Sequence, residues 1–376
     1  MRGFAPFCGQ DVGHDLSEAV ARMTRIAAVH GVLPPHRHRQ REITDMVART
    51  CLPDGSDRRV LDRIHGNAGV RSRNTVLPLG DYAGLNDFGA ANDVFIDVGT
   101  RLGAEAVGSA LAAVGLEPSD VDVLMSTTVT GVAAPTLDAR LVPVLGLRHD
   151  VRRVPLFGLG CVAGAAGVAR LHDLVAGDPD AVAVLLSVEL CSLTVQRDDT
   201  SMANLVASGL FGDGAAAVVL VGDRRAARLG IDGPSVVATR SRLYPDTERV
   251  MGWDIGGSGF RIVLAASVAD VVEEHLGQDV TAFLGDHELK VDDVETWVAH
   301  PGGPKVLHAM SRTLGLAPGS LDRTWRSLEQ VGNLSSASVL HVLAAALAEP
   351  RPAPGSPAVM LAMGPGFCSE LVLLRW

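Results

Sequence analysis

Two segments of this chain, 172 positions apart, carry the same arrangement of residues. Gly158–Gly167 is rich in glycine and alanine, contains Cys161 and opens one predicted helix, whereas Val331–Ser338 contains Asn333 and opens another. An aspartate and an apolar strand precede each helix, and a second apolar strand follows it, at offsets of 173 and 175 positions. A repeat with so constant an offset predicts two related halves. It would place Cys161 and Asn333 at equivalent helix N-termini, where the halves could face each other.

Length and composition limit the class of protein. A chain of 376 residues exceeds what one core usually holds, which favours two halves, 1–223 and 224–376. With 47% apolar and 20% charged residues the chain is globular, and its net charge of -10 argues against general nucleic-acid binding. Its cysteines form no CxxC pair and predict reduced thiols. We find no run of membrane-span length and no signal peptide, so the expected location is cytoplasmic.

Helices and strands alternate along the chain, which predicts an α/β protein. In the first half we expect strands at 25–32, 121–127, 182–188 and 214–221, and helices at 42–51, 58–68, 92–114, 162–175 and 201–209. In the second half we expect strands at 234–241, 259–263, 295–299, 357–362 and 369–375, and helices at 267–285, 303–314 and 334–348. The polar run 222–225 would be a turn, and the run 35–39 a solvated basic turn. Two such halves would stack as a five-layer αβαβα sandwich.

Three polar residues stand where α/β proteins place functional groups. Cys161 begins a helix, whose dipole and free N–H groups would favour the thiolate. His300 ends an apolar strand and enters a glycine- and proline-rich loop, from which it could pair with the thiolate or hold an oxyanion. Asn333 offers an amide that donates to an oxyanion without titrating. Taken singly, each has an ordinary alternative: a small buried thiol, a turn contact and an N-cap.

Together, Cys161, His300 and Asn333 resemble the catalytic triad of the thiolase superfamily. Five motifs extend the resemblance to the type III polyketide synthases, the chalcone synthase family: GLGC at 158–161, LFGDGAA at 210–216, HPGGP at 300–304, GNLSSAS at 332–338 and MGPGF at 363–367. The resemblance runs from about residue 25 to residue 376. It implies a thiolase-like five-layer sandwich and an acyltransferase that condenses coenzyme A thioesters.

The resemblance also implies roles for single residues. Cys161 would accept the acyl group of an acyl-CoA primer, and His300 and Asn333 would hold the enolate that malonyl-CoA forms when it loses CO2. Phe211 matches the family's gating phenylalanine, between the coenzyme A tunnel and the cavity. The matching positions for coenzyme A are Arg63, Gly302, Gly303 and Lys305. Ordinary surface charge is the alternative for the two cations. The family is homodimeric and needs no metal or redox cofactor, and the sequence shows no metal-ligand spacing.

The positions expected to shape the cavity are Thr130, Ala134, Cys191, Thr194, Trp253 and Ser335. Plant chalcone synthases have a bulky methionine from the partner subunit at the position of Ala134. With Thr130 and Cys191, this small residue resembles the bacterial long-chain alkylpyrone and alkylresorcinol synthases, in which a fatty acyl primer would gain about 0.8 kcal/mol per buried CH2. Trp253 or Met251 could refill the space. Three alternatives stay open: a malonyl-primed hydroxynaphthalene synthase, an initiating ketoacyl-acyl-carrier-protein synthase and an inactive acyl-CoA-binding scaffold.

Overall fold

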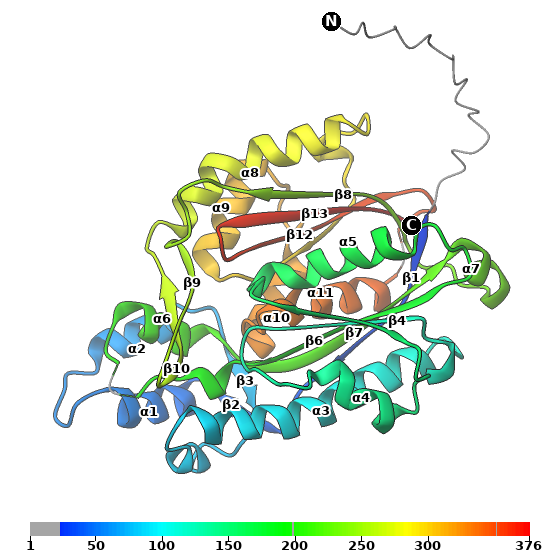
Figure 1. Ribbon diagram of the computed structural model, residues 1–376. Helices are drawn as coiled ribbons and strands as arrows, with labels where there is room; N and C mark the ends of the chain where they lie inside the picture. The colour runs from blue at the N-terminus through cyan, green and yellow to red at the C-terminus, as the bar shows by residue number, and fades with distance from the viewer. Residues whose placement is uncertain (1–22, 198, 351) are drawn as a thin grey trace, which may run out of the picture.

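The computed structural model describes residues 23–197, 199–350 and 352–376, so Cys8 lies outside the described residues. Figure 1 shows helices and strands stacked in layers from top to bottom. Within the described ranges, nine strands belong to one sheet, in the order β11-β12-β13-β8-β1-β7-β6-β4-β5. These strands are β1 (Thr24–Val32), β4 (Val123–Thr128), β5 (Arg152–Phe157), β6 (Val182–Leu190), β7 (Asp213–Gly222), β8 (Ser235–Leu243), β11 (Thr296–Ala299), β12 (Pro357–Gly364) and β13 (Cys368–Arg375).

The two halves of this sheet repeat one pairing scheme. In the first half β4 runs parallel to β6, β6 antiparallel to β7, and β7 antiparallel to β1. In the second half β11, β12, β13 and β8 follow in the same order with the same directions. β1 and β8 join the halves through a short antiparallel pairing at Thr24 and Arg25. The strand repeat agrees with the duplication in the sequence, whereas the division at residues 223 and 224 stays a prediction.

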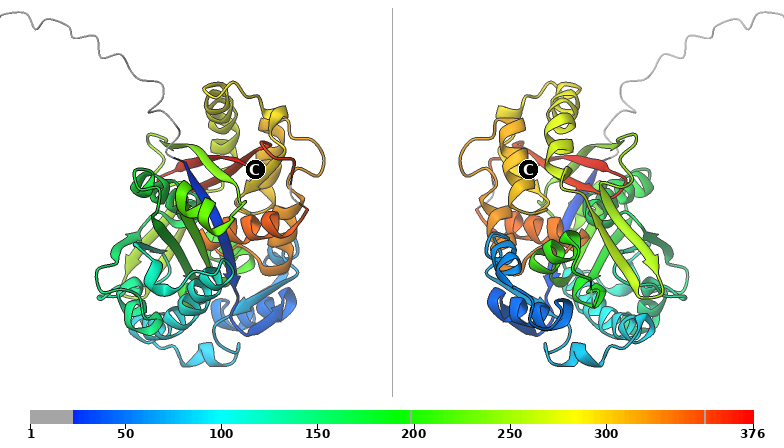
Figure 2. Two further views of the ribbon diagram at one scale, coloured as in Figure 1. Left: turned by 90° about the vertical axis from the view of Figure 1, so that its right-hand side faces the viewer. Right: turned by 90° about the vertical axis from the view of Figure 1, so that its left-hand side faces the viewer.

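Helices cover both outer faces and fill the space between the halves. α3 (Phe88–Ala112) and α4 (Leu137–Leu145) pack on the first half, and α8 (Val268–Gly285) and α9 (Pro304–Leu314) pack on the second. α5 (Ala163–Val175) and α11 (Ser336–Ala348) lie between the halves. Figure 2 shows α8 and α9 at one end of the molecule and α3 at the other, with α11 between them. This is the predicted five-layer αβαβα sandwich.

The other elements gather mainly along the edges of the layers. They are α1 (Gln40–Cys51), α2 (Arg59–Gly66), α6 (Met202–Leu210), α7 (Asp223–Leu229), α10 (Asp322–Val331), the 3-10 turns η1 (Asp81–Gly84), η2 (Pro118–Asp120), η3 (Gly160–Val162), η4 (Cys191–Thr194) and η5 (Val291–Asp293), and two ribbons, β2 (His36–Arg39) with β3 (Ser72–Thr75) and β9 (Met251–Gly256) with β10 (Gly259–Leu264). No helix in the described part of the chain is long and apolar enough to cross a membrane.

Several local expectations were wrong. The run 222–225 begins α7 instead of forming a turn, because Ala226 is buried and Gly230 ends the helix in the left-handed conformation. The run 36–39 is a strand, β2, which pairs with β3 instead of being a solvated turn. α3 begins before residue 92, because the carboxylate of Asp87 accepts the backbone N–H of Ala90. Five further helices and strands of the described chain, β3, α4, β5, β9 and α10, were not anticipated.

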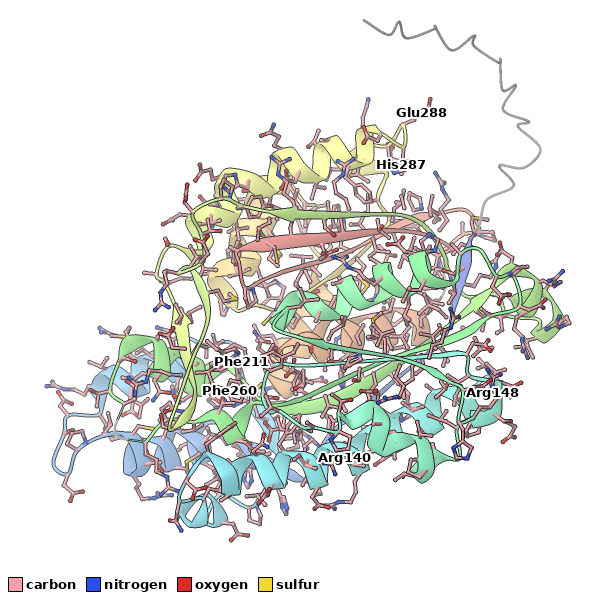
Figure 3. All side chains as sticks on the ribbon, viewed as in Figure 1. Arg140, Arg148, Phe211, Phe260, His287 and Glu288 are labelled. Carbon is pink, nitrogen blue, oxygen red and sulfur yellow. The ribbon has the colours of Figure 1, made fainter. Side chains whose placement is uncertain are left out.

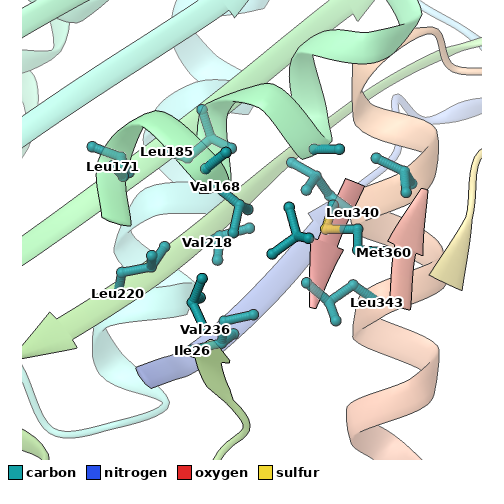
Figure 4. Close-up of a cluster of buried hydrophobic side chains, with 14 of the residues drawn as sticks. Ile26, Val168, Leu171, Leu185, Val218, Leu220, Val236, Leu340, Leu343 and Met360 are labelled. Carbon is teal, nitrogen blue, oxygen red and sulfur yellow. The ribbon is translucent and has the colours of Figure 1, made fainter. Parts of the chain in front are cut away.

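The central strands are buried on both faces. Along β6, Ala183 and Leu185 belong to the cluster around α5 and α11, whereas Val184 and Leu186 belong to the cluster under α3. This alternation follows from the two-residue period of a strand. Figure 4 shows the central cluster, in which side chains from both halves of the sheet meet those of α5 and α11. One continuous core therefore fixes the two middle helices relative to each other.

Glycine allows α5 and α11 to approach closely. A Cβ added to Gly164 of α5 would lie 2.3 Å from the backbone oxygen of Ser336, the first residue of α11. One turn further along α5, a Cβ added to Gly167 would lie 2.5 Å from the side chain of Leu185. The small residues at the start of α5 are thus required by contacts with a neighbouring helix and a neighbouring strand.

Candidate active site

The two middle helices and strand β11 bring three predicted residues to one cavity. Cys161 lies in η3, immediately before α5, and Asn333 lies in the turn that precedes α11. His300 directly follows β11, and its backbone N–H continues the strand pairing by donating to the oxygen of Leu361 at 2.8 Å. All three residues line a cavity that holds about 430 Å³ of empty space. The rest of its lining is mainly apolar: Leu210, Phe211, Met251, Leu264, Val268, Gly302, Val306, Met310, Met363 and Phe367.

The thiol of Cys161 is nearly inaccessible to solvent, with 6% of the residue exposed. Its Sγ lies 3.8 Å from the Oγ of Ser335, to which it donates. Burial raises the pKa of Cys161 to about 12, although the contact with Ser335 opposes the shift. Burial therefore opposes the expected preference for the thiolate, which stays a prediction. A helix N-terminus stabilises an anion by less than about 1 kcal/mol, under one pKa unit, and desolvation outweighs it.

The imidazole of His300 has no hydrogen-bond partner within the described residues, although both ring nitrogens are buried. Burial lowers the pKa of His300 to about 3, which keeps the ring neutral. Buried polar groups in proteins are nearly always paired, so an unpaired ring in a cavity indicates a partner supplied from outside. A neutral imidazole can serve such a partner as both donor and acceptor.

The amide of Asn333 is held in one orientation by its own turn. Its Oδ1 accepts the backbone N–H of Ser335 at 2.8 Å and lies 3.5 Å from the hydroxyl of Ser338. Because the oxygen is engaged in this way, the two N–H donors of Nδ2 are left for another acceptor. Asn333 thus differs from a simple N-cap, in which the side-chain oxygen alone would have a function.

A short backbone pairing holds Phe211 beside Asn333. The N–H of Asn333 donates to the oxygen of Leu210 at 2.8 Å, and the N–H of Gly212 donates to the oxygen of Asn333 at 2.9 Å. Gly332 makes this pairing possible, because its φ is +75° and an added Cβ would lie 2.7 Å from the oxygen of Leu210. The position of Phe211 and that of Asn333 are therefore coupled through the main chain.

Phe211 also lines a second cavity, of about 540 Å³, so it stands between two spaces. Figure 3 labels Phe211, which follows α6, and Phe260 on β10. Cys191, Thr194 and Trp253 line this second cavity, as predicted for residues that shape the substrate space. Its lining is more polar than that of the first cavity: Arg73, Thr75, Ser192, Asn204 and Ser208 contribute to it.

Two predicted cavity residues lie elsewhere. Thr130 lines a more open neighbouring pocket, and its hydroxyl is engaged, donating to Glu189 at 3.0 Å and accepting the N–H of Leu190 at 2.9 Å. Ala134 is exposed and lines neither of the two cavities beside Phe211. Its role in shaping the substrate space stays a prediction.

The four positions expected to bind coenzyme A fall on two neighbouring segments. Gly302 lines the first cavity, and Gly303 precedes α9. Lys305 is exposed in the first turn of α9, and Arg63 is exposed in the last turn of α2. The segments meet at the turn after α2, where a Cβ added to Gly69 would lie 3.1 Å from Pro304. Neither cation pairs with a carboxylate of the described chain.

Two buried charged residues near the site were missed from the sequence. Glu189, near the end of β6, accepts hydrogen bonds from Thr130, from the N–H of Val129 and from Ser336, and burial raises its pKa. A carboxylate near the end of an otherwise mostly apolar strand is a signal that could have revealed it. Arg73 lies in β3, within a short polar run that gives no such signal. Among the described residues, no three His, Cys, Asp or Glu side chains gather in a way that could hold a metal ion.

Comparison with known proteins assigns the family. The model for the N-terminal domain of chalcone and stilbene synthases matches residues 17–224, and the model for the C-terminal domain matches residues 235–376. A 1,3,6,8-tetrahydroxynaphthalene synthase of Streptomyces peucetius subsp. caesius is 58% identical over 357 residues, which cover 95% of this chain and 94% of that protein. The chain belongs to the chalcone and stilbene synthase family.

Other relatives agree with this assignment. The synthase superposes on the crystal structure of 1,3,6,8-tetrahydroxynaphthalene synthase from Streptomyces coelicolor A3(2), a bacterial type III polyketide synthase, with a TM-score of 0.88 and 29% identity over 94% of this chain and 99% of that one. An alpha-pyrone synthesis polyketide synthase-like protein of Mycobacterium tuberculosis is 27% identical, covering 93% of this chain and 91% of that protein. The synthase is therefore a type III polyketide synthase, an acyltransferase that condenses coenzyme A thioesters.

Proposed function

We propose that the synthase primes itself with malonyl-CoA and produces a tetrahydroxynaphthalene. The identity of 58% to the Streptomyces peucetius synthase carries this proposal, since the relative associated with alpha-pyrones is only 27% identical. These values favour the hydroxynaphthalene alternative over the long-chain alkylpyrone and alkylresorcinol reading of the sequence. The ring skeleton of naphthalene corresponds in carbon to five malonyl units that have each lost CO2.

The cavity behind Phe211 also supports a polar product. Its lining includes hydroxyls and an amide, from Thr75, Ser192, Thr194 and Asn204. A fatty acyl chain gains free energy mainly by burying CH2 groups against apolar walls, and the polar side chains in this lining interrupt its apolar walls. A polyketide with alternating carbonyl groups suits it better. Within a single chain, the exposed Ala134 and the engaged hydroxyl of Thr130 give no added support to a fatty acyl tunnel.

The chemical steps follow from the three residues of the first cavity. We assign the nucleophile to Cys161: its sulfur attacks the thioester of malonyl-CoA, the bond from carbonyl carbon to coenzyme A sulfur breaks, and the coenzyme A thiol leaves. A proton moves from Cys161 to the unpaired imidazole of His300, which produces two opposite charges together in the cavity. Each of these charges alone would cost desolvation free energy in the buried cavity. The attraction between the two opposite charges offsets part of that cost.

Chain extension would use His300 and Asn333 as donors. A further malonyl-CoA loses CO2, and the electron pair of the broken C–C bond becomes an enolate, whose oxygen accepts from the ring of His300 and from Nδ2 of Asn333. The enolate carbon attacks the thioester carbon on Cys161, and the bond from that carbon to Sγ breaks. The lengthened chain is then carried by coenzyme A. The hydroxyl of Ser335 lies beside the Sγ of Cys161 and accepts its hydrogen bond.

The remaining assignments concern binding and assembly. We assign Phe211 as the gate between the cavities, and Arg63, Gly302, Gly303 and Lys305 as the residues that bind coenzyme A. The two cations are exposed and have no carboxylate partner in the described chain, which suits contacts with phosphate. We also propose a cytoplasmic homodimer, in which the exposed loop around Ala134 contacts the partner subunit.

The deciding experiment supplies uniformly 13C-labelled malonyl-CoA alone, and then with unlabelled acetyl-, hexanoyl- or palmitoyl-CoA. Mass spectrometry should find a tetrahydroxynaphthalene whose carbons are all labelled, formed without any primer and not diluted by unlabelled acetyl-CoA. Cys161→Ala serves as the control and should give no product. Products that require a long-chain primer would restore the alkylpyrone reading. No product from any thioester would leave the carrier-protein-dependent synthase or the binding scaffold.

A further inference from the structure

Arg73 of β3 is a buried cation beneath the candidate active site to which the proposed reaction gives no part. The residue is 2% exposed, and the buried carboxylate of Asp213 interacts with its charge from beyond ion-pair distance. Burial lowers the pKa of Arg73 only to about 10, so it stays charged at neutral pH. Burying a cation that has no carboxylate in an ion pair costs free energy. An arginine in such a position therefore suggests a role for its side chain.

The hydrogen bonds of Arg73 are directed at the gate. Nη1 donates to the backbone oxygen of Phe211 at 2.5 Å, and Nη2 donates to Oε1 of Gln40 at 3.0 Å. Nε is buried without a partner. Gln40 is anchored in turn, because its amide donates to the backbone oxygens of His65 and Gly209. The guanidinium thus ties the carbonyl of Phe211 to the neighbouring helices α2 and α6.

The aliphatic part of Arg73 packs against the turn that carries Asn333. A Cβ added to Gly332 would lie 2.9 Å from Cγ and Cδ of Arg73, and one added to Gly212 would lie 3.5 Å from its Cβ. Gly332 and Gly212 flank the backbone pairing between Phe211 and Asn333. The side chain of Arg73 therefore packs against both backbone segments of this pairing, the one at Phe211 and the one at Asn333.

We infer that Arg73 is a positioning residue, which holds the pairing of Phe211 with Asn333 and so fixes where the amide of Asn333 points within the cavity. This inference rests on the proposed role of Asn333 as a donor to the enolate. Arg73 also contributes to the lining of the second cavity, but the positioning proposed for it acts through the main chain of Phe211 and Asn333. Its planar fork reaches two acceptors at once, which a lysine cannot reproduce.

Displacing the amide has a definite chemical consequence. An enolate that is poorly held takes a proton from solvent instead of attacking the thioester, so malonyl-CoA and a proton give acetyl-CoA and CO2. Carbon–carbon bond formation demands closer alignment than protonation, and a displacement of about 1 Å can cost on the order of 100-fold in rate. The fraction of malonyl-CoA that ends as acetyl-CoA therefore reports on the position of Asn333.

The test compares the wild-type synthase with Arg73→Met and Arg73→Lys, and follows malonyl-CoA, acetyl-CoA and polyketide together by mass spectrometry. Arg73→Met should lower kcat for the polyketide by about 10- to 100-fold, with KM for malonyl-CoA nearly unchanged, and should raise the ratio of acetyl-CoA to polyketide. Arg73→Lys should lie between Met and wild type. Asn74→Ala is the matched control, because Asn74 is the next residue of β3, is equally buried and donates to Pro34 instead.

The ratio separates positioning from simple loss of structure, because a smaller folded fraction lowers both products equally. An unchanged ratio in Arg73→Met, or the same rise in Asn74→Ala, overturns the inference. If Arg73→Met does not fold, Arg73→Lys decides: a raised ratio supports positioning and a wild-type ratio refutes it. A wild-type synthase that forms no polyketide refutes the proposed function, and with it the role of Asn333 on which the inference stands.

Discussion

Replacing Gly164 by alanine tests the helix contact on which both halves of the site depend. The added Cβ would lie 2.3 Å from the backbone oxygen of Ser336 and 2.6 Å from Cγ1 of Val339. Carbon and oxygen approach comfortably only to about 3.3 Å, so α11 must move away by about 1 Å. The obstacle is backbone, so no rotamer change relieves it. Overpacking of a core costs about 1–3 kcal/mol, and the better helix propensity of alanine returns about 0.5–1 kcal/mol. The expected net loss is about 1 kcal/mol.

Urea unfolding followed by far-UV circular dichroism measures this loss as a lower midpoint. Gly108→Ala in α3 is the control, because the nearest atom to its added Cβ is Cδ2 of Leu145 at 3.8 Å. That variant should gain about 0.5–1 kcal/mol from propensity alone. Because Cys161 and Asn333 stand at the starts of the two helices, activity per folded molecule should also fall in Gly164→Ala. A midpoint as high as that of Gly108→Ala would refute the close contact of α5 and α11.

Three other measurements concern the site and the core. His300→Gln should slow alkylation of Cys161 by iodoacetamide near pH 7 by up to about 1,000-fold, because an ion pair at about 4 Å contributes about 4 kcal/mol, or about three pKa units; an equal rate would show that His300 does not hold the thiolate. Phe211→Ala joins the two cavities and should broaden the range of acyl-CoA primers used, and an unaltered range would argue against the gate. Burial lowers the pKa of His341 to about 4 from an ordinary value of 6.5, so its contribution to stability is present above pH 6.5 and is lost as the pH falls toward 4. His341→Gln should flatten the fall of the urea midpoint over that window, and an equally steep fall would contradict the assignment.

Much of the fold could be predicted because the duplication, the strand lengths and the small residues of α5 all indicate the same architecture. The missed elements lack these signals. β5 is an edge strand that contains Pro155, a residue that argues against a central strand but is tolerated at an edge. α10 is mostly polar and buries only Thr324 and Leu328. Too few apolar residues therefore recur at helical spacing for the sequence to indicate a helix there. Local elements at the rim of the sandwich depend on tertiary contacts that the sequence does not display.

The three residues of the first cavity could be predicted because each stands at the end of a strand or the start of a helix, where topology alone decides the place. The shape of the second cavity could not. A small residue opens space only where its neighbours leave it open, and Ala134 is exposed and lines neither of the two cavities beside Phe211. The sequence also offers no measure of how deeply Cys161 is buried, and this burial opposes the effect of the neighbouring helix on the pKa of its thiol.

The duplication gives one explanation for the core and for the site. Each half presents the N-terminus of a middle helix to the same cavity, so one scaffold position can carry a nucleophile in Cys161 and the other a fixed amide donor in Asn333. The distance between the two is set by the contact of Gly164 with Ser336, which tolerates no added atom. His300 comes from β11 and Arg73 from β3, outside both helices. Changes at the helix contact should therefore lower stability and activity together, whereas changes at His300 or Arg73 should lower activity and leave the sandwich intact.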